Sequence, residues 1–325
     1  MSTSPNAVVQ GTSLLEPDVV ARLMRAGFQA RQPMSGNMSG SHRSPHKGSS
    51  VEFAEYRKYV QGDDIRMLDW RVYARTDRFY MKEFEADTNL RAFFVLDASA
   101  SMNYAGAAVS ASGAAPFGGA GEHAPGGPRS KVALARRLVA TMAYLLVKQG
   151  DAAGLSCASD KMVVEIPARR NPSHLSTLFQ QLEGLRAAGT TELPAVLHTL
   201  AEKMPRRSLV VITSDLFCDA EAFADALRHL RHRNNDVIVF HTLDRTEIDF
   251  PFTGPIRFLD LESPFTLLAE PEIIRDQYLT ACREHLAAIR HACDTTRTEY
   301  RQVLTDEPYE NALASTFLDR IRGKR

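Results

Sequence analysis

Hydroxyl and carboxylate side chains follow two apolar segments of the chain, in a pattern that suits a hard metal ion. The segments are residues 92–96 and 209–212, and the loop 189–192 between them reads Gly-Thr-Thr-Glu. The side chains placed directly after the segments are Asp97, Ser99, Ser101 and Asp215. Oxygen ligands of this kind suit Mg²⁺ better than zinc. We therefore predict a cation site with few carboxylates and many hydroxyls, at which the ion still accepts a carboxylate from outside.

An alternation of strands and helices must position these side chains. Apolar runs such as 92–96 are typical of strands that are covered on both faces, and the helical spacing of apolar residues over 131–149 predicts a helix. The predicted strands are 78–85, 92–96, 152–157, 162–166, 209–212, 237–240, 256–259 and 300–304. The predicted helices are 16–28, 131–149, 173–185, 193–203, 220–232, 272–291 and one from 310. This order predicts an α/β fold with a doubly wound, mostly parallel sheet of Rossmann type, whose ligands bind beyond the carboxyl ends of the strands.

The composition divides the chain into three parts. We expect an N-terminal tail with a short helix in 1–34, a charged, β-containing subdomain in 35–90, and the α/β domain in 91–325. The Ala- and Gly-rich insertion 105–128 has too little apolar surface to order itself, so we expect a flexible loop there. Trp70, the only tryptophan, is expected to anchor a core between subdomains.

The candidate ligands resemble the metal-ion-dependent adhesion site of von Willebrand factor A-type domains. The resemblance lies in Asp97-Ala98-Ser99-Ala100-Ser101, in the loop Gly189-Thr190-Thr191-Glu192-Leu193 and in Asp215. It implies that Asp97, Ser99 and Ser101 supply the first ligand loop, Thr191 the second and Asp215 the third. Thr190 remains the alternative to Thr191. The implied cofactor is Mg²⁺, with Mn²⁺ or Ca²⁺ as alternatives.

A second motif precedes this domain. Residues 57–70, RKYVQGDDIRMLDW, followed by Ala74-Arg75, are similar to the signature of the bacterial family called domain of unknown function 58, which joins such a segment to a von Willebrand A-type domain. The likeness runs from about Gly40 to the C-terminus, without the insertion. It implies a chaperone-like adaptor that acts with a MoxR-type AAA+ ATPase in the assembly or activation of other proteins.

Several function classes fit the sequence less well. The chain of 325 residues has 39 basic and 39 acidic side chains, which gives no bulk attraction for nucleic acid. Its longest apolar run, 138–147, is too short to span a membrane, and four scattered cysteines are typical of a reduced, cytoplasmic setting.

Two alternative interpretations of the motifs remain open. Asp97 could serve a metal-dependent phosphohydrolase, although such enzymes place a second Asp where Ser99 stands. We expect a protein without enzymatic activity instead. The charged residues around the second motif form either a network of ion pairs between subdomains or a partner-binding surface.

Overall fold

The computed structural model describes residues 14–26, 52–59, 70–85, 90–106, 126–159 and 162–321. Its centre is a six-stranded sheet with the order β10-β7-β6-β3-β4-β5, in which only β5 is antiparallel to its neighbour. The strands are β3 (Arg91–Asp97), β4 (Ala152–Ala158), β5 (Met162–Arg169), β6 (Leu209–Ser214), β7 (Asp236–Leu243) and β10 (Glu299–Leu304). The predicted doubly wound, mostly parallel sheet is therefore confirmed.

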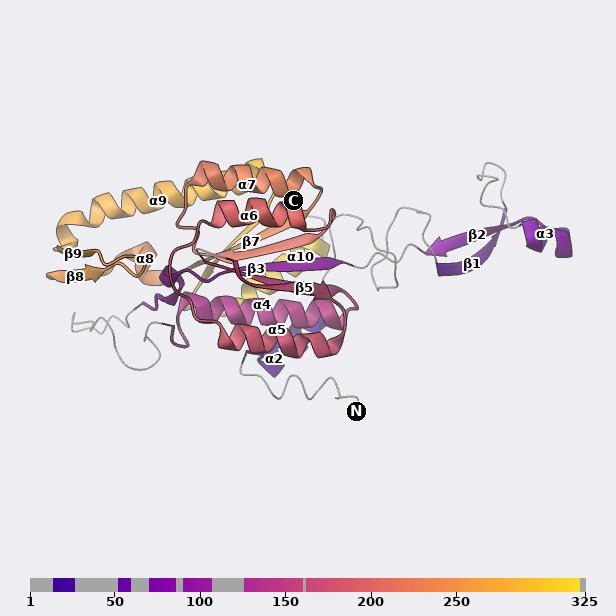
Figure 1. The fold of residues 1–325 in the computed structure, drawn as a ribbon, viewed down its shortest axis with the longest axis horizontal. Helices are drawn as coiled ribbons and strands as arrows, with labels where there is room; N and C mark the ends of the chain where they lie inside the picture. The colour runs from indigo at the N-terminus through magenta and orange to yellow at the C-terminus, as the bar shows by residue number, and fades with distance from the viewer. Residues whose placement is uncertain are drawn as a thin grey trace.

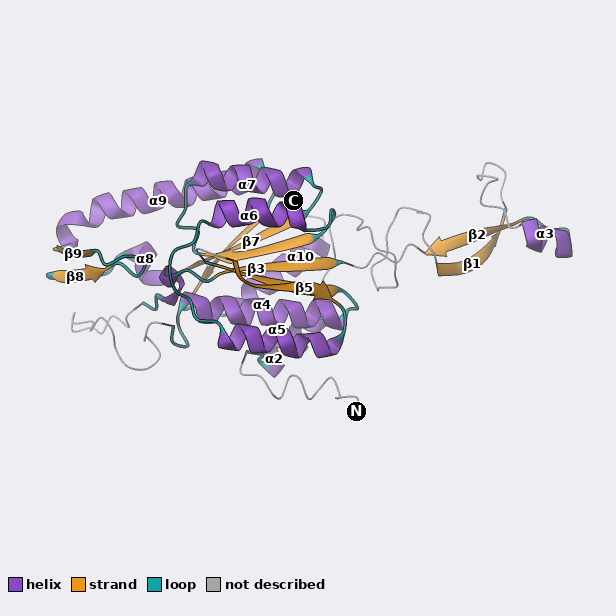
Figure 2. Cartoon of the chain, in the orientation of Figure 1, coloured by secondary structure: helices purple, strands orange, loops and turns teal. Residues whose placement is uncertain are grey.

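Helices cover both faces of this sheet (Figures 1 and 2). One face carries α2 (Pro17–Ala26), α4 (Lys131–Lys148), α5 (Pro172–Gly184) and α10 (Tyr309–Ile321). The other carries α6 (Leu193–Lys203), α7 (Ala220–His232) and α9 (Pro271–Thr295). Consecutive residues of β3 take opposite sides, since Phe94 belongs to the first core and Val95 to the second. A strand buried on both faces must be apolar throughout, which is the pattern that the sequence shows.

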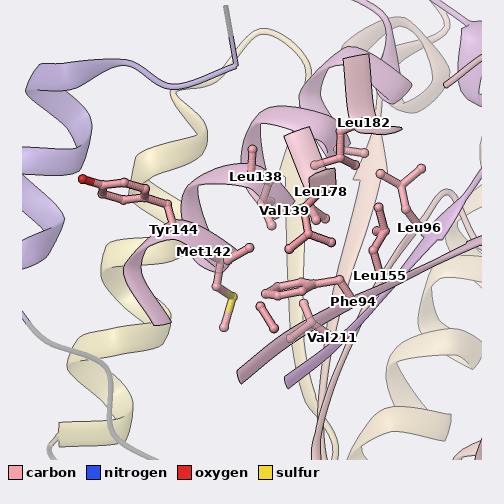
Figure 3. Close-up of a cluster of buried hydrophobic side chains, with 14 of the residues drawn as sticks. Phe94, Leu96, Leu138, Val139, Met142, Tyr144, Leu155, Leu178, Leu182 and Val211 are labelled. Carbon is pink, nitrogen blue, oxygen red and sulfur yellow. The ribbon is translucent and has the colours of Figure 1, made fainter. Parts of the chain in front are cut away.

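The first core explains why α4 is so apolar. Fourteen of its residues are buried, because α4 lies between the sheet and three further helices, α2, α5 and α10. Figure 3 shows the labelled side chains of the strands, of α4 and of α5 packed together: Phe94, Leu96, Leu155, Val211, Leu138, Val139, Met142, Leu178 and Leu182. Burial of this kind contributes roughly 1.5–3 kcal/mol for each large apolar side chain. The position of β3 in the middle of the sheet is therefore fixed from both sides.

Helix α2, which lies within the predicted helix 16–28 of the N-terminal segment, packs against the same core. Leu15, Val19 and Leu23 are buried against the first core, and Arg22 pairs with Glu310 at the start of α10 at 2.9 Å. Pro17 occupies the first turn of α2, where a missing N–H costs nothing. A helix that precedes the sheet by more than 60 residues in the sequence is thus part of the α/β unit.

The charged segment contains a small antiparallel pair of strands and a helix. These are β1 (Glu52–Lys58), α3 (Trp70–Thr76) and β2 (Tyr80–Glu85). The ring of Tyr73 stacks on that of Phe79 at a centroid distance of 4.5 Å. Trp70 is 59% exposed and meets only the edge of Tyr73 among the described residues, so the prediction that it anchors a core is wrong. The short helix α3, seven residues long, and one aromatic neighbour cover too little of the indole to bury it.

Three short elements near the carboxyl edge of the sheet were not predicted. They are the 3₁₀ turn η2 (Ala100–Asn103), helix α8 (Arg245–Asp249) and strand β9 (Thr266–Ala269), which pairs with β8 (Ile256–Leu259) as a hairpin. Most of the Ala- and Gly-rich insertion, 107–125, and the motif residues 60–69 lie outside the described residues. In the part of the chain that is described, no helix has the length and apolarity needed to cross a membrane.

Candidate metal-binding site

The candidate ligands meet at the carboxyl edge of the sheet because β3 and β6 are neighbours. The two strands run parallel, with Leu96 opposite Thr213. Asp97 at the end of β3 therefore lies beside Ser214 and Asp215, which end and follow β6. Loops at this edge of a doubly wound sheet are where ligands bind. The parallel pairing of β3 and β6 therefore brings Asp97 and Asp215 to the same edge, as the sequence predicts.

Asp97 organises the loop that follows it. Its Oδ1 accepts a hydrogen bond from the Ser99 backbone N–H at 2.9 Å, and its Oδ2 accepts one from the Ser214 hydroxyl at 2.6 Å. The first bond closes an Asx-type turn, which reverses the chain just after the strand. The hydroxyls of Ser99 and Ser101 then lie 2.9 Å apart. Alternate residues of the loop thus present their oxygens together, as their spacing predicts.

The threonine loop is tied to the Asp97 loop by backbone hydrogen bonds. Ala100 N–H donates to Gly189 C=O at 2.9 Å, and Ala188 N–H donates to Ala98 C=O at 2.8 Å. The Thr191 hydroxyl donates to Ala158 C=O at 3.3 Å, and the same carbonyl accepts from Ala98 N–H. Thr191 therefore lies beside the first ligand loop. Thr190, the alternative ligand, is exposed.

Asp97 and Asp215 are both almost completely buried, at 4% and 2% exposure. Burial raises the pKa of Asp97 above its ordinary value, and the negative charge of Asp215 raises it further; hydrogen bonds from Ser214 and Ser99 act in the opposite direction. Two buried carboxylates that repel each other are stabilised by a shared cation. The pair thus has the electrostatic property that a cation site needs.

A buried lysine, which the sequence analysis missed, lies against this pair. Lys131 Nζ donates to Asp215 Oδ2 at 2.8 Å and to Glu247 Oε1 in α8 at 2.7 Å, and its side chain has no exposed surface. Burial lowers the pKa of Lys131, but the two carboxylates outweigh it and hold the pKa above its ordinary value. The ammonium also lies 4.9 Å from the centre of the Phe217 ring, within reach of a cation–π interaction.

A buried histidine, His241, hydrogen-bonds the backbone at Asp215. His241 Nε2 lies 2.8 Å from Asp215 C=O, and its Nδ1 lies 2.8 Å from the Tyr300 hydroxyl. Burial lowers the pKa of His241 to about 4, so the ring is neutral near pH 7. The neutral ring donates from Nε2 to the carbonyl and accepts from Tyr300 at Nδ1. His241 thus fixes Asp215 without competing for a cation.

The oxygen donors fit a hard divalent cation that keeps some of its waters. Asp97, Ser99, Ser101, Thr191 and Asp215 offer two carboxylates and three hydroxyls. Among the described residues, no group of three or more His, Cys, Asp or Glu side chains could hold a metal ion. A cation at this edge would therefore depend on the hydroxyls and on water, as Mg²⁺ does when few carboxylates are available.

A family model described as "Protein of unknown function DUF58" matches residues 55–288. The chain belongs to this family. Proteins similar to this DUF58 chain include the "Uncharacterized protein Mb1516" of Mycobacterium bovis and the "Uncharacterized protein Rv1480" of Mycobacterium tuberculosis. Each is 24% identical over 98% of this chain and 96% of the relative.

Solved structures with some similarity to the DUF58 chain include two from Bacteroides. The conserved hypothetical protein BatB of Bacteroides thetaiotaomicron is 11% identical, with a TM-score of 0.43, over 72% of this chain and 100% of that one. An aerotolerance-related membrane protein of Bacteroides fragilis is 15% identical, with the same TM-score and the same coverage. The SpRpn10 VWA domain is 11% identical, with a TM-score of 0.37, over 69% of this chain and 93% of that one.

Three side chains of the candidate site were not among the predicted ligands: Ser214, Lys131 and Glu247. Ser214 is adjacent to Asp215 in the sequence, so its position at a strand end was a usable signal. Lys131 interrupts the apolar surface of α4 at its first residue, which is the only local sign of its burial. Glu247 reaches Lys131 from α8, which is 116 residues away in the chain, and nothing in the local sequence marks this contact.

Proposed function

We propose that this DUF58 protein is an adaptor that binds other proteins through a divalent cation. Asp97, Ser99, Ser101, Thr191 and Asp215 would hold Mg²⁺, with Mn²⁺ or Ca²⁺ as alternatives. A bound cation with incomplete neutralisation would supply an electrophilic position for a carboxylate of the partner. The observation that supports the proposal best is the buried pair Asp97 and Asp215, at the edge of the sheet and beside the paired Ser99 and Ser101 hydroxyls.

The charges of the buried cluster agree with a divalent ion. The Lys131 ammonium pairs with Asp215 and Glu247, and Asp97 lies close enough to Asp215 for the two carboxylates to repel each other. Lys131 and Glu247 balance each other, which leaves two buried carboxylates for a cation of charge +2. Lys131 also holds one oxygen of Asp215, which weakens that carboxylate as a ligand. A cation there would keep part of its attraction for an external carboxylate.

The partner that we propose is a MoxR-type AAA+ ATPase, together with a client protein that is assembled or activated. This part rests on the family resemblance of residues 57–75 and on the family match. We place the adaptor in the cytoplasm, where the four cysteines, all within the described residues, would remain the free thiols that the structure has.

The geometry favours binding over phosphoester hydrolysis. A nucleophilic aspartate needs an ionised oxygen that is free to attack. Both oxygens of Asp97 accept hydrogen bonds, from Ser99 and Ser214, and burial raises its pKa. These features make Asp97 a poor nucleophile but suit a carboxylate that a cation would stabilise.

The test is binding of a purified MoxR-type ATPase to the full-length chain in Mg²⁺ and in EDTA. We expect binding in Mg²⁺ that falls at least about tenfold in EDTA or with Asp97→Ala, which corresponds to about 1.4 kcal/mol. Asp225→Ala, which removes an exposed carboxylate of α7, is the matched control and should bind like the wild type. Equal binding by Asp97→Ala and the wild type, in Mg²⁺ and in EDTA alike, would contradict the cation-dependent mechanism.

A further inference from the structure

Exposed apolar side chains are concentrated on one part of the molecule. Of the twelve large apolar side chains that are exposed in the described residues, six lie within 259–273. They are Leu259, Leu261, Phe265, Leu267, Leu268 and Ile273. Leu268 and Ile273 are 74% and 75% exposed. A concentration of this kind, with charged residues around it, marks an interaction surface more often than single exposed side chains do. We call residues 256–276, the β8–β9 hairpin with the start of α9, the hairpin surface.

The two faces of the hairpin have different neighbours. In antiparallel pairs, residues directly opposite each other point to the same face. Phe258 lies opposite Leu267, and its ring stacks on Phe250 at 5.8 Å, so this face is turned toward the protein. Leu268 and Leu259 lie at the alternate positions of the register and are directed to the other face. That outer face is covered by nothing in the described residues, since both side chains are exposed.

The hairpin surface is held in a defined position by α9. Phe250, which begins the connection to β8, stacks on Tyr278 of α9 at 4.3 Å. Arg275 donates through its Nε to Phe250 C=O at 3.3 Å and through a terminal nitrogen to Phe252 C=O. Glu272 accepts a hydrogen bond from Gly254 N–H at 2.8 Å. Because the surface is formed in advance, a partner would lose little binding energy to its ordering.

The same contacts connect the hairpin surface to the candidate metal site. The Tyr278 hydroxyl donates to Glu247 C=O at 2.9 Å, and the Glu247 side chain pairs with Lys131, which binds Asp215. In Figure 1, β8, β9 and α8 lie close together at the left end of the α/β unit. A partner that reaches the metal site therefore has an exposed apolar surface next to it.

The charge of the hairpin surface indicates what kind of partner fits. It has five carboxylates and two guanidinium groups: Asp260, Glu262, Glu270, Glu272 and Asp276 against Arg257 and Arg275. Arg275 is already engaged by backbone carbonyls. Hydrogen bonds from the Ser263 hydroxyl and the Glu262 backbone N–H lower the pKa of Asp260, and one from Gly254 N–H lowers the pKa of Glu272, so both carboxylates are ionised at neutral pH. Arg257 shares the outer face with Leu268, but the hairpin surface as a whole has more carboxylates than guanidinium groups, five against two.

This charge disfavours two other occupants. A second copy of the chain, related by a twofold axis, would bring the same carboxylates face to face, and like charges across an interface oppose association. A membrane with anionic lipids would repel the surface in the same way. An apolar segment that carries Lys or Arg would satisfy both the apolar side chains and the carboxylates.

We propose that the hairpin surface docks an amphipathic, basic segment of the partner protein, beside the metal site. The proposal rests on the proposed function for the identity of the partner, but the contact itself does not use the cation. Leu259 and Leu268 of the outer face, Phe265 at the tip and Ile273 at the start of α9 supply its apolar part. Glu270 and Asp276 supply charges that pair with the basic side chains of the partner.

The experiment measures binding of two fluorescent synthetic peptides to the full-length chain. Both are amphipathic, with leucines on one face; one carries lysines on the other face and its matched control carries glutamates. We expect the lysine peptide to bind at least about tenfold more tightly than the glutamate peptide. Phe265→Ser/Leu268→Ser and Glu270→Lys/Asp276→Lys should each weaken binding of the lysine peptide by about tenfold or more.

Two controls separate this proposal from its alternatives. Leu318→Ser/Ile321→Ser changes exposed apolar residues of α10 and should bind the lysine peptide like the wild type. Equal binding of the two peptides, or equal binding by the hairpin variants and this control, would overturn the docking proposal. So would hairpin-dependent dimerisation in sedimentation analysis, or hairpin-dependent binding to anionic vesicles, without peptide binding.

The metal site is tested apart from the hairpin. Asp97→Ala should bind the lysine peptide like the wild type, even where it no longer binds the ATPase. Loss of peptide binding in this variant, in spite of an unchanged melting temperature, would show that the hairpin does not act independently of the cation. Failure of the cation mechanism alone would leave the peptide result intact.

Discussion

Lys131 donates a 2.8 Å hydrogen bond to Asp215 inside the protein, at the edge of the sheet where we place the cation. The ammonium is completely buried and also pairs with Glu247. It therefore links α4 to the end of β6 and to α8. Removal of one member of such a cluster leaves the others buried without compensation, which costs more than the pair itself contributes.

We therefore expect Lys131→Met to destabilise the protein by about 3–5 kcal/mol, because it leaves Asp215 and Glu247 without their cation. The measurement is urea unfolding followed by circular dichroism, in buffer without divalent ions. Lys148→Met, at the other end of α4 and partly exposed, is the matched control and should cost less than about 1 kcal/mol. Similar losses for the two variants would mean that burial of the ammonium has no special role.

Asp97→Asn should separate stability from cation binding. Without divalent ions we expect the variant to melt at or above the wild-type temperature, because the repulsion between Asp97 and Asp215 is removed. In saturating Mg²⁺ the wild type should gain about 2.7 kcal/mol at a concentration of 100 times Kd, and the variant should gain none. Differential scanning fluorimetry with and without Mg²⁺ measures both effects. A gain in Mg²⁺ that is the same for both proteins would rule out Asp97 as a ligand.

Asp244 should contribute to stability in a pH-dependent way. Burial raises its pKa, but hydrogen bonds from Thr246, Thr305 and Gly106 outweigh burial and hold the pKa below the ordinary value. The unfolded chain then takes up the proton before the folded one, so the contribution is present above about pH 4 and is lost as the pH falls further.

The prediction for Asp244 is tested with Asp244→Asn, which keeps the shape but removes the charge. We expect it to be less stable than the wild type by about 1–3 kcal/mol at neutral pH, because hydrogen bonds to a charged group are lost. In urea unfolding over a pH series, the difference should shrink toward acid pH. A difference that stays constant down to the lowest pH would show that the Asp244 charge does not contribute.

Arg320 should hold the last helix through a buried ion cluster. Its side chain pairs with Asp236 at 2.7 Å and with Glu299 at 2.9 Å, both on adjacent strands of the sheet. We expect Arg320→Met to cost up to about 3–5 kcal/mol in urea unfolding, since two buried carboxylates lose their closest partner and keep only Arg231 at 3.7 Å and Arg301 at 3.5 Å. Arg22→Met breaks the exposed pair with Glu310 of the same helix and should cost less than about 1 kcal/mol. The reverse order of the two losses would contradict this account.

The strands and helices of the sheet could be predicted because their apolar pattern is local. The prediction for α7, 220–232, matches the structure at both ends, since Asp219 caps its first turn and apolar residues recur at helical spacing. Strand β9 was missed because all but one of its residues are exposed, so no apolar face had to repeat. Helix α8 was missed because five residues are too few to show a helical period.

The sequence by itself determined the order of the strands along the chain and the polar residues that end them. Asp97 and Asp215 could be brought together on paper, because parallel strands place their carboxyl ends at the same edge. Only the tertiary structure decided which side chains share those carboxylates. Ser214 turns to Asp97, and Lys131 joins Asp215 to Glu247 across 116 residues. Such contacts depend on packing between distant elements, and local sequence periodicity carries no record of them.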